Sequence, residues 1–342
     1  MNHTMADRTQ RARAAQPLIA CYGEALVDVI LQPYAQENSL SNAAMACLGG
    51  SVFNFALASA RQGVATAYLN PLSADAFGRQ FRTILQAEGV ALPMASLPEQ
   101  ACIQPTSLAM VQLQNDAKAS YIFHRESVAD RSASATQTIM AIPPSTTLLH
   151  TGCLTLMPQD WPTTAQILRH AAAQGLCISI DANMRPAACP DGDRYRAAVV
   201  QALEMAHIAK VSDDDLTALG LDAHNPLLAA QTLMESSHIK LLALTLGAQG
   251  AWLLSRTAQA SALPVPALKV IDTVGAGDCF YAGLLAWLAR QGLLTKAALG
   301  GLSQDMLQAA VAHASFAASI NVERSGCNPA TWSETIAFGL KA

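Results

Sequence analysis

Short apolar runs alternate along this chain with stretches in which apolar residues recur at helical spacing. The apolar runs, which are typical of buried strands, cover residues 18–31, 65–70, 147–152, 176–181, 207–211 and 239–246. The stretches of helical spacing cover residues 51–62, 76–88, 160–174 and 193–205, and further ones begin at 213 and 278. Strands and helices in alternation build a parallel sheet whose faces are covered by helices. The pattern therefore predicts an α/β fold with a mostly parallel sheet flanked by helices.

Two stretches interrupt this alternation, at about residues 32–46 and 104–125. Within the second, two strand-like runs flank a polar turn, which is typical of an antiparallel hairpin. We assign both stretches to a small β lid, so that residues 17–342 form one domain with a discontinuous lid. Residues 1–16 contain three arginines without the apolar h-region of useful length that a secretory signal has, and we expect a disordered, solvated arm there.

The composition indicates a globular domain that binds a small ligand. Hydrophobic residues make up 51% of the 342 residues and charged ones 13%, which is ample for a large core. The net charge of −4 gives no basic surface for nucleic acid or for a membrane. None of the eight cysteines forms a C-x-x-C pair, and free thiols suit a reducing compartment. We therefore expect a cytoplasmic protein that binds neither nucleic acid nor a membrane.

The segment from Asp272 to Asp278 concentrates the chain's chemistry between an apolar run and a helical pattern. Gly275, Ala276 and Gly277 carry little or no side chain, so a ligand can approach their backbone closely. Unpaired N–H groups at the N-terminus of the following helix attract phosphate. The carboxylate of Asp278 would repel phosphate, so we assign it the task of accepting a proton from an attacking hydroxyl. The alternative is that Asp278 only stabilises its own helix dipole.

The segment from Asp272 to Leu285 resembles the second signature of the PfkB, or ribokinase-like, carbohydrate kinases, with its Gly-Ala-Gly-Asp intact. Further segments resemble that family in the same order, from about residue 18 to residue 335. The resemblance implies a ribokinase-like three-layer fold with a small β lid. It also implies that Asp278 is the catalytic base, beside a Gly275–Gly277 turn that holds the transferred phosphoryl group. With a reference pKa of about 3.9, Asp278 is expected to be ionised at neutral pH and to be a weak base.

Two segments resemble the sugar-binding part of the family. Cys21–Asp28 resembles its first strand, whose aspartate, here Asp28, holds sugar hydroxyls; a carboxylate can accept two hydroxyl protons. Gly49-Gly50 and Asn54 match a Gly-Gly…Asn segment that closes on the sugar, although Ser51-Val52 stands where many members have Ala-Pro or a further small residue. The alternatives are a solvated aspartate at a strand end and an ordinary glycine turn before a helix.

Two arginines are also assigned to the substrate. Arg125 lies in a segment similar to the Arg-x-x-x-Ala-Asp pattern of fructokinases, and it is expected to reach the sugar from above; a solvated arginine at the lid edge is the alternative. The segment Asp181-Ala-Asn183-Met-Arg185-Pro186 resembles the Asp-Pro-Asn-Leu-Arg-Pro of fructokinases and related hexose or keto-sugar-acid kinases. Because it follows a strand, Asp181, Asn183 and Arg185 are expected to point into the ligand crevice, where Arg185 can bind phosphate or carboxylate.

The nucleotide and its metal ion are assigned by the same resemblance. ATP is expected to contact Asn183, Ser212, Thr245, Gly247, Gly250, Gly275 and Gly277. Asp215 matches an acidic position that contributes indirectly, through water, to Mg²⁺; acids after Ser212 are equally typical of a helix cap without metal. Asp272 matches a position associated with K⁺ in potassium-dependent members.

The sequence thus predicts a kinase that transfers the γ-phosphate of ATP to a sugar hydroxyl. Fructose is the favoured sugar because of the segments that contain Arg125 and Arg185. A 2-keto-3-deoxygluconate kinase is the first alternative, since Arg185 would pair with that acid's carboxylate, and a ribokinase or nucleoside kinase shares the catalytic residues. A catalytically inactive sugar-binding regulator would be expected to lose Asp278. Edge strands in the lid also favour a homodimer.

Overall fold

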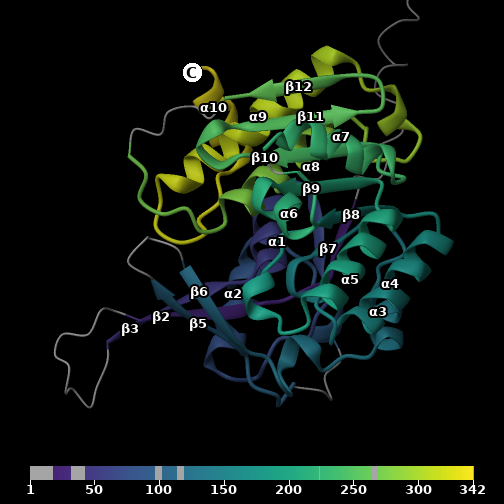
Figure 1. Cartoon of the computed structure of the whole chain (residues 1–342). Coiled ribbons are helices and arrows are strands. Elements are labelled where there is room, and N and C mark those ends of the chain that lie inside the picture. The colour runs from purple at the N-terminus through teal and green to yellow at the C-terminus, as the bar shows by residue number, and fades with distance from the viewer. Residues whose placement is uncertain are drawn as a thin grey trace, which may run out of the picture.

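The computed structural model describes residues 18–31, 43–96, 102–113, 119–222, 224–263 and 269–341 (Figure 1). Its centre is an eight-stranded sheet in the order β12-β11-β10-β9-β8-β7-β1-β4. Six neighbouring strands are parallel: β1 (Leu18–Cys21), β4 (Ala65–Tyr68), β7 (Thr146–Gly152), β8 (Cys177–Asp181), β9 (Ile208–Ser212) and β10 (Leu241–Thr245). At one edge, two antiparallel strands follow: β11 (Ala251–Ser255) and β12 (Gln259–Ala262). The mostly parallel sheet that the alternation predicts is therefore confirmed.

Helices cover both faces of this sheet. One face packs against α1 (Ser51–Arg61), α2 (Ala76–Ala87), α8 (Ala276–Arg290) and α9 (Gln304–Val322), with α10 (Trp332–Gly339) at its margin. The other packs against α3 (Ala135–Ala141), α4 (Trp161–Ala173), α5 (Gly192–Met205), α6 (Asp213–Ala218) and α7 (Pro226–Glu235). Successive side chains of a strand point to opposite faces, and in β7 Leu148 belongs to the first core while Leu149 belongs to the second. The sheet with helices on both faces therefore forms the three layers that were predicted.

A separate four-stranded sheet forms the lid, which projects to the lower left in Figure 1. Its order is β3-β2-β5-β6, and its strands are β2 (Leu26–Leu31), β3 (Ala44–Gly49), β5 (Ser107–Leu113) and β6 (Ala119–His124). The antiparallel pairing of β5 with β6 confirms the hairpin predicted within 104–125. The described part of the lid begins at Leu26 instead of residue 32, because the apolar run 18–31 divides at residues 22–25 between two sheets.

Several predictions fall on residues outside the described ranges. They include the arm at 1–16 and most of the stretch 32–46, of which β3 contains the last three residues and extends to Gly49. The helix expected from 213 is confirmed as α6, but it ends at Ala218. In the part of the chain that the structure describes, no helix is both long and apolar enough to cross a membrane.

Candidate active site

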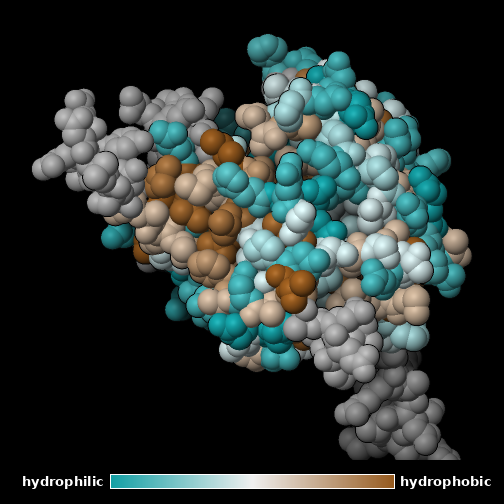
Figure 2. Space-filling view, turned by 90° about the horizontal axis from the view of Figure 1, so that it is seen from below, coloured by the Kyte–Doolittle hydropathy of each residue, from teal (hydrophilic) through white to brown (hydrophobic). Residues whose placement is uncertain are grey.

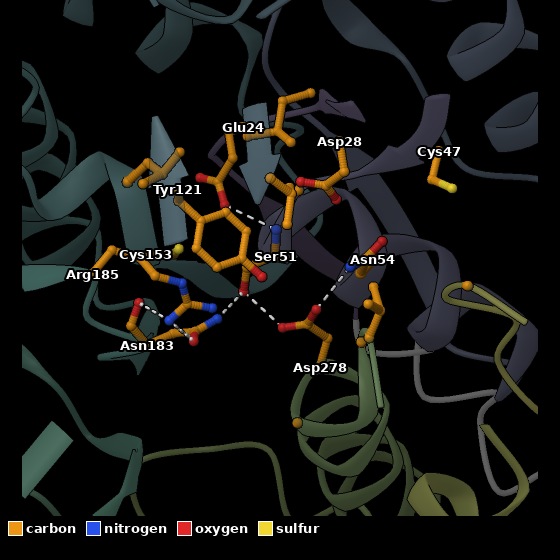
Figure 3. Close-up of a pocket in the computed structure, with 18 of the residues that line it drawn as sticks. Glu24, Asp28, Cys47, Ser51, Asn54, Tyr121, Cys153, Asn183, Arg185 and Asp278 are labelled. Atoms are coloured by element: carbon orange, nitrogen blue, oxygen red, sulfur yellow. Dashed lines mark hydrogen bonds between the residues drawn. The ribbon is translucent and has the colours of Figure 1, made fainter. Parts of the chain in front are cut away.

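A pocket lies between the lid and the carboxyl-terminal ends of the parallel strands (Figure 3). Crevices at these strand ends are the usual ligand sites of open α/β sheets. The lid contributes Asp28, Cys47 and Tyr121, and the loops after strands β1, β7 and β8 contribute Glu24, Cys153, Asn183 and Arg185. The segment 272–278, the start of α1 and Lys210 form further parts of the wall. The predicted lid, sugar segment and phosphate turn therefore meet at one place.

The pocket wall formed by the segment 272–278 includes the N-terminus of α8, which begins at Ala276 with Gly275 as its N-cap. Gly275 has a φ of 73°, and a Cβ there would lie 2.4 Å from Sγ of Cys327, so only glycine fits. At Gly277 a Cβ would lie 3.4 Å from Cε of Lys210. Asp278 lies in the first helical turn, as the sequence predicts. The turn therefore presents backbone to the pocket where an anion would be stabilised.

Asp278 is 6% exposed and accepts two side-chain hydrogen bonds. Oγ of Ser51 donates to its Oδ1 at 2.7 Å, and Nδ2 of Asn54 donates to its Oδ2 at 2.9 Å. Burial raises the pKa of Asp278, while the hydrogen bonds from Asn54 and Ser51 oppose that rise. The carboxylate is thus a stronger base than the ordinary value expected from the sequence, because the surrounding protein excludes water.

Asp28 faces the pocket from the lid (Figure 3). It lies in β2 and not, as the resemblance implies, on the first strand of the main sheet, since the chain changes sheets after Cys21. Burial raises its pKa to about 6, and Arg185 opposes this rise. A Cβ on Gly49 would lie 2.5 Å from Oδ2 of Asp28, and Gly50 has a φ of 107°. Gly49 therefore makes room for the Asp28 carboxylate, and Gly50 adopts a backbone conformation that favours glycine.

The loop after β8 places two of its three predicted side chains in the pocket. Asn183 and Arg185 line it, and Nη1 of Arg185 donates to Oδ1 of Asn183 at 2.7 Å. Asp181 lies behind them, where its Oδ1 accepts a 2.9 Å hydrogen bond from Nζ of Lys210 in a buried ion pair. The expectation that Asp181 points into the crevice is therefore corrected, because Asp181 is not among the residues that line the pocket and its carboxylate pairs with Lys210.

Lys210 is a site residue that the sequence analysis did not single out. It lines the pocket with only 4% of its surface exposed, and a Cβ on Gly277 would lie 3.5 Å from its Nζ. Although burial opposes its charge, the carboxylates of Asp181 and Asp215 raise its pKa. The signal was available, since a lysine inside an otherwise apolar buried strand requires a partner. Its ammonium group places a permanent positive charge beside the α8 N-terminus.

Glu24 was also missed. It lines the pocket and is 1% exposed, and its Oε1 accepts a 2.9 Å hydrogen bond from the backbone N–H of Ser51. Burial raises its pKa to about 7, although the positive charge of Arg125 lowers it. This carboxyl group fixes the start of α1, which carries both Ser51 and Asn54.

Arg125 is placed differently from its prediction. Its guanidinium donates to Oδ2 of Asp130 at 3.0 Å and to Oδ2 of Asp160 at 3.1 Å, and the residue is buried. It does not belong to the residues that line the pocket. Neither a sugar contact from above nor a solvated lid edge describes it, because two carboxylates hold the guanidinium below the lid.

Ser212 and Asp215 form a reciprocal helix cap. Oγ of Ser212 accepts from the N–H of Asp215 at 3.1 Å, and Oδ2 of Asp215 accepts from the N–H of Ser212 at 2.8 Å. The other oxygen of Asp215 accepts from the N–H of Met184 at 2.7 Å. This geometry agrees with the capping alternative. Among the described residues there is no group of three or more His, Cys, Asp or Glu that could hold a metal ion.

Of the remaining nucleotide and cation positions, only Asp272 lines the pocket. Asp272 lines it, and its oxygens accept hydrogen bonds from the N–H groups of Val274 at 3.0 Å and Gly326 at 2.9 Å, which joins two loops. Thr245 ends β10 beside Ser212, and Gly247 and Gly250 form the following turn. Thr245, Gly247 and Gly250 lie outside the pocket lining, at the carboxyl-terminal end of β10.

A buried carboxylate at a helix N-terminus, facing a lid that carries a second carboxylate, is the arrangement expected of a phosphotransferase acting on a hydroxyl compound. The sequence model of the pfkB family carbohydrate kinases matches residues 16–334, and the chain belongs to that family. The protein is thus a carbohydrate kinase with the ribokinase-like fold, and both predictions are confirmed.

Individual relatives agree with this assignment. Over 293 residues the chain is 32% identical to a fructokinase from Rhizobium leguminosarum bv. trifolii, covering 85% of this chain and 86% of that one. A fructokinase from Vibrio alginolyticus is 31% identical over 270 residues, or 78% of this chain and 83% of that one. The crystal structure of a fructokinase with bound ATP from Xylella fastidiosa superposes with a TM-score of 0.80 at 26% identity, covering 95% and 99% of the two chains.

Proposed function

We propose that this carbohydrate kinase is an ATP-dependent fructokinase. The observation that carries the proposal is the buried carboxylate of Asp278, held at the N-terminus of α8 and facing the lid carboxylate of Asp28 across one pocket. Fructokinases among the relatives support fructose as the sugar. The relative from Xylella fastidiosa, whose crystal structure contains ATP, supports ATP as the donor.

In the proposed reaction the sugar hydroxyl attacks the γ-phosphorus as its proton passes to the carboxylate of Asp278. The new O–P bond forms while the bond between the γ-phosphorus and the β–γ bridging oxygen breaks, so ADP leaves with the electron pair of that bond. The raised pKa of Asp278 suits this task, because a stronger base accepts the proton more readily. Ser51 and Asn54 hold the base in place.

The charge on the transferred group is stabilised by the backbone of Ala276, Gly277 and Asp278 and by the ammonium of Lys210. Mg²⁺, when bound, would neutralise the ATP phosphates. The described carboxylates do not form a protein cage for it, since Asp181 pairs with Lys210 and Asp215 with backbone N–H groups. We therefore propose that the ion is held mainly by phosphate and water, and that Asp215 acts on it only through water.

The outer part of the nucleotide is assigned to the strand ends beyond β9. Thr245, Gly247 and Gly250 lie there and remain the proposed contacts, whereas the side chains of Asn183 and Ser212 already have partners within the protein. For K⁺ we propose the loops that Asp272 joins, and an assay that replaces K⁺ by tetramethylammonium tests this. Equal rates in the two salts would remove K⁺ from the proposal.

The pocket also favours one alternative substrate. The guanidinium of Arg185 lies in the lining, 5.8 Å from the ring centroid of Tyr121, and it could pair with the carboxylate of 2-keto-3-deoxygluconate. The deciding experiment measures kcat/KM with MgATP for fructose, 2-keto-3-deoxygluconate and ribose. We expect fructose to be preferred. Preference for the acid would replace the assignment, and sugar binding without turnover of any sugar would indicate a regulator.

We further propose that the protein is cytoplasmic and forms a homodimer through the lid. Its eight free cysteines suit a reducing compartment. The strand register aligns Ala46, Val29, Met110 and Ile122 in one row across the lid, next to the row that contains Asp28. Adjacent rows point to opposite faces, so this apolar row lies on the face away from the pocket. Ile122 is 62% exposed, and hydrophobic residues gather on this side of the molecule in Figure 2.

A further inference from the structure

We propose that Ser51 is a positioning residue that sets the orientation and the proton affinity of Asp278. The inference rests on the proposed role of Asp278 as the base. It concerns a side chain to which the resemblance assigns no role, since only Gly49, Gly50 and Asn54 of this segment are assigned to the sugar. The observation that carries it is a hydrogen-bonded chain of side chains that ends on Asp278 (Figure 3).

The donors and acceptors in this row of hydrogen-bonded side chains have a fixed direction. A guanidinium can only donate, so the atom of Asn183 that lies 2.7 Å from Nη1 of Arg185 must be its oxygen. The amide nitrogen of Asn183 consequently faces Ser51, and it donates to Oγ at 2.9 Å. The single hydroxyl proton of Ser51 is then directed to Oδ1 of Asp278, at 2.7 Å. The positive charge of Arg185 thereby orients every donor along the chain.

Ser51 is itself held in place. It is the first residue of α1, and its backbone N–H donates to Oε1 of Glu24 at 2.9 Å. Asn54, three residues later on the same helical face, donates to the second oxygen of Asp278. One helix therefore fixes both oxygens of a carboxylate that another helix, α8, carries. Each oxygen keeps a further lone pair for the hydroxyl of the substrate.

The chemical consequence is a balance between two effects. Burial raises the pKa of Asp278, and the Ser51 hydroxyl lowers it by stabilising the charged form. Without the hydroxyl the base would be protonated up to a higher pH. Its carboxylate would also be free to rotate away from the direction of the attacking hydroxyl.

Ser51→Ala tests this inference, and alanine is a good helix former at this position. For the variant we expect kcat to fall about tenfold, because it loses one hydrogen bond to a charged group. The acid limb of the kcat/KM profile should move up by about one pH unit, with KM for ATP unchanged. Ser51→Thr retains the hydroxyl and should keep the acid limb of the parent protein. Asn183→Gly, which tolerates the φ of 34° found at that residue, should shift the limb in the same direction by a smaller amount.

Ser59→Ala is the matched control. Ser59 is a fully buried serine of the same helix, and in the described part of the chain its hydroxyl has no hydrogen-bond partner. Its pH profile should equal that of the parent. The inference fails if Ser51→Ala, folded as judged by its thermal unfolding, keeps the parental acid limb, or if Ser51→Thr shifts it as far as alanine does. A parent protein that phosphorylates no sugar would instead overturn the proposed function.

Discussion

The two halves of the proposed reaction are assigned to regions that differ in burial: the carboxyl-terminal ends of the strands in the main sheet, and the lid. Strand β8 is buried over its whole length, and β9 over all but its last residue. In the lid, most of β2 is half-buried and the first residues of β3 are exposed. Asp278, the proposed base, is held by α1 and α8, whereas Asp28 lies on the small sheet.

From this difference in burial we expect the chemical step to take place on the more buried part of the molecule and sugar capture on the part that opens more easily. Segments with few buried apolar contacts open locally at low free energy, and a substrate lid must open in every cycle. Substitutions at the carboxyl-terminal ends of the main-sheet strands and at the N-terminus of α8 should therefore change kcat. Substitutions in the lid should change KM for the sugar or the association of the protein into dimers. Four predictions test that division.

Asp278→Asn should have the largest effect. It keeps the shape of the side chain but removes the proton acceptor, so kcat should fall by about a thousandfold or more while the melting temperature stays near that of the parent. Asp305→Asn, which changes an exposed aspartate in the first turn of α9, is the control and should leave kcat unchanged. Near-parental turnover in Asp278→Asn would remove this residue from the mechanism.

Lys210→Met should come second. Removing a charge that stabilises the transferred group should lower kcat by about a hundredfold. It also leaves Asp181 without its buried partner, at a cost of about 3–5 kcal/mol in the free energy of unfolding. The double variant Lys210→Met/Asp181→Asn should recover most of the stability but not kcat. If stability and kcat recover together, Lys210 is only structural.

Asp28→Asn should raise KM for the sugar about tenfold, the cost of one hydrogen bond to a charged group, with a smaller effect on kcat and on stability. The pKa of Asp28 is about 6, and only its ionised form accepts hydroxyl protons with both oxygens. The parent's KM for the sugar should therefore be constant well above pH 6, where Asp28 is fully ionised, and rise as pH falls through 6. Initial rates between pH 5 and 8 measure this, and a similar rise in Asp28→Asn would assign it to another group.

Ile122→Asp should have the smallest effect on catalysis. It places a charge on the exposed apolar row of the lid, which should shift sedimentation toward monomers while kcat changes by less than about twofold, as expected of a surface position. Thr217→Asp, at an exposed position of α6, is the control for an added surface charge. A parent protein that sediments as a monomer at micromolar concentration would contradict the proposed dimer.

The sequence predicted most of the fold because its signals are local. The boundaries of α1 and α2 lie within one residue of those expected from helical spacing, and the glycine turn at 275–277 marked the start of α8. The run 18–31 was read as one strand, since a period of two cannot reveal that consecutive strands join different sheets. Arg125 was assigned to the sugar because a pattern along the chain does not show that Asp130 and Asp160 surround the guanidinium.

By itself, the sequence determined the fold class and the position of the glycine turn before α8, and it proposed Asp278 as the base, because hydrophobic period and glycine conformation act over a few residues. Only the tertiary structure decided what surrounds that base. Ser51 and Asp278 are 227 positions apart in the chain, but Oγ of Ser51 lies 2.7 Å from Oδ1 of Asp278. Lys210 and Gly277 are neighbours only because β9 and α8 meet in the folded protein. The pKa of a buried carboxylate is set by such neighbours and by the exclusion of water, and neither is a local property of the chain.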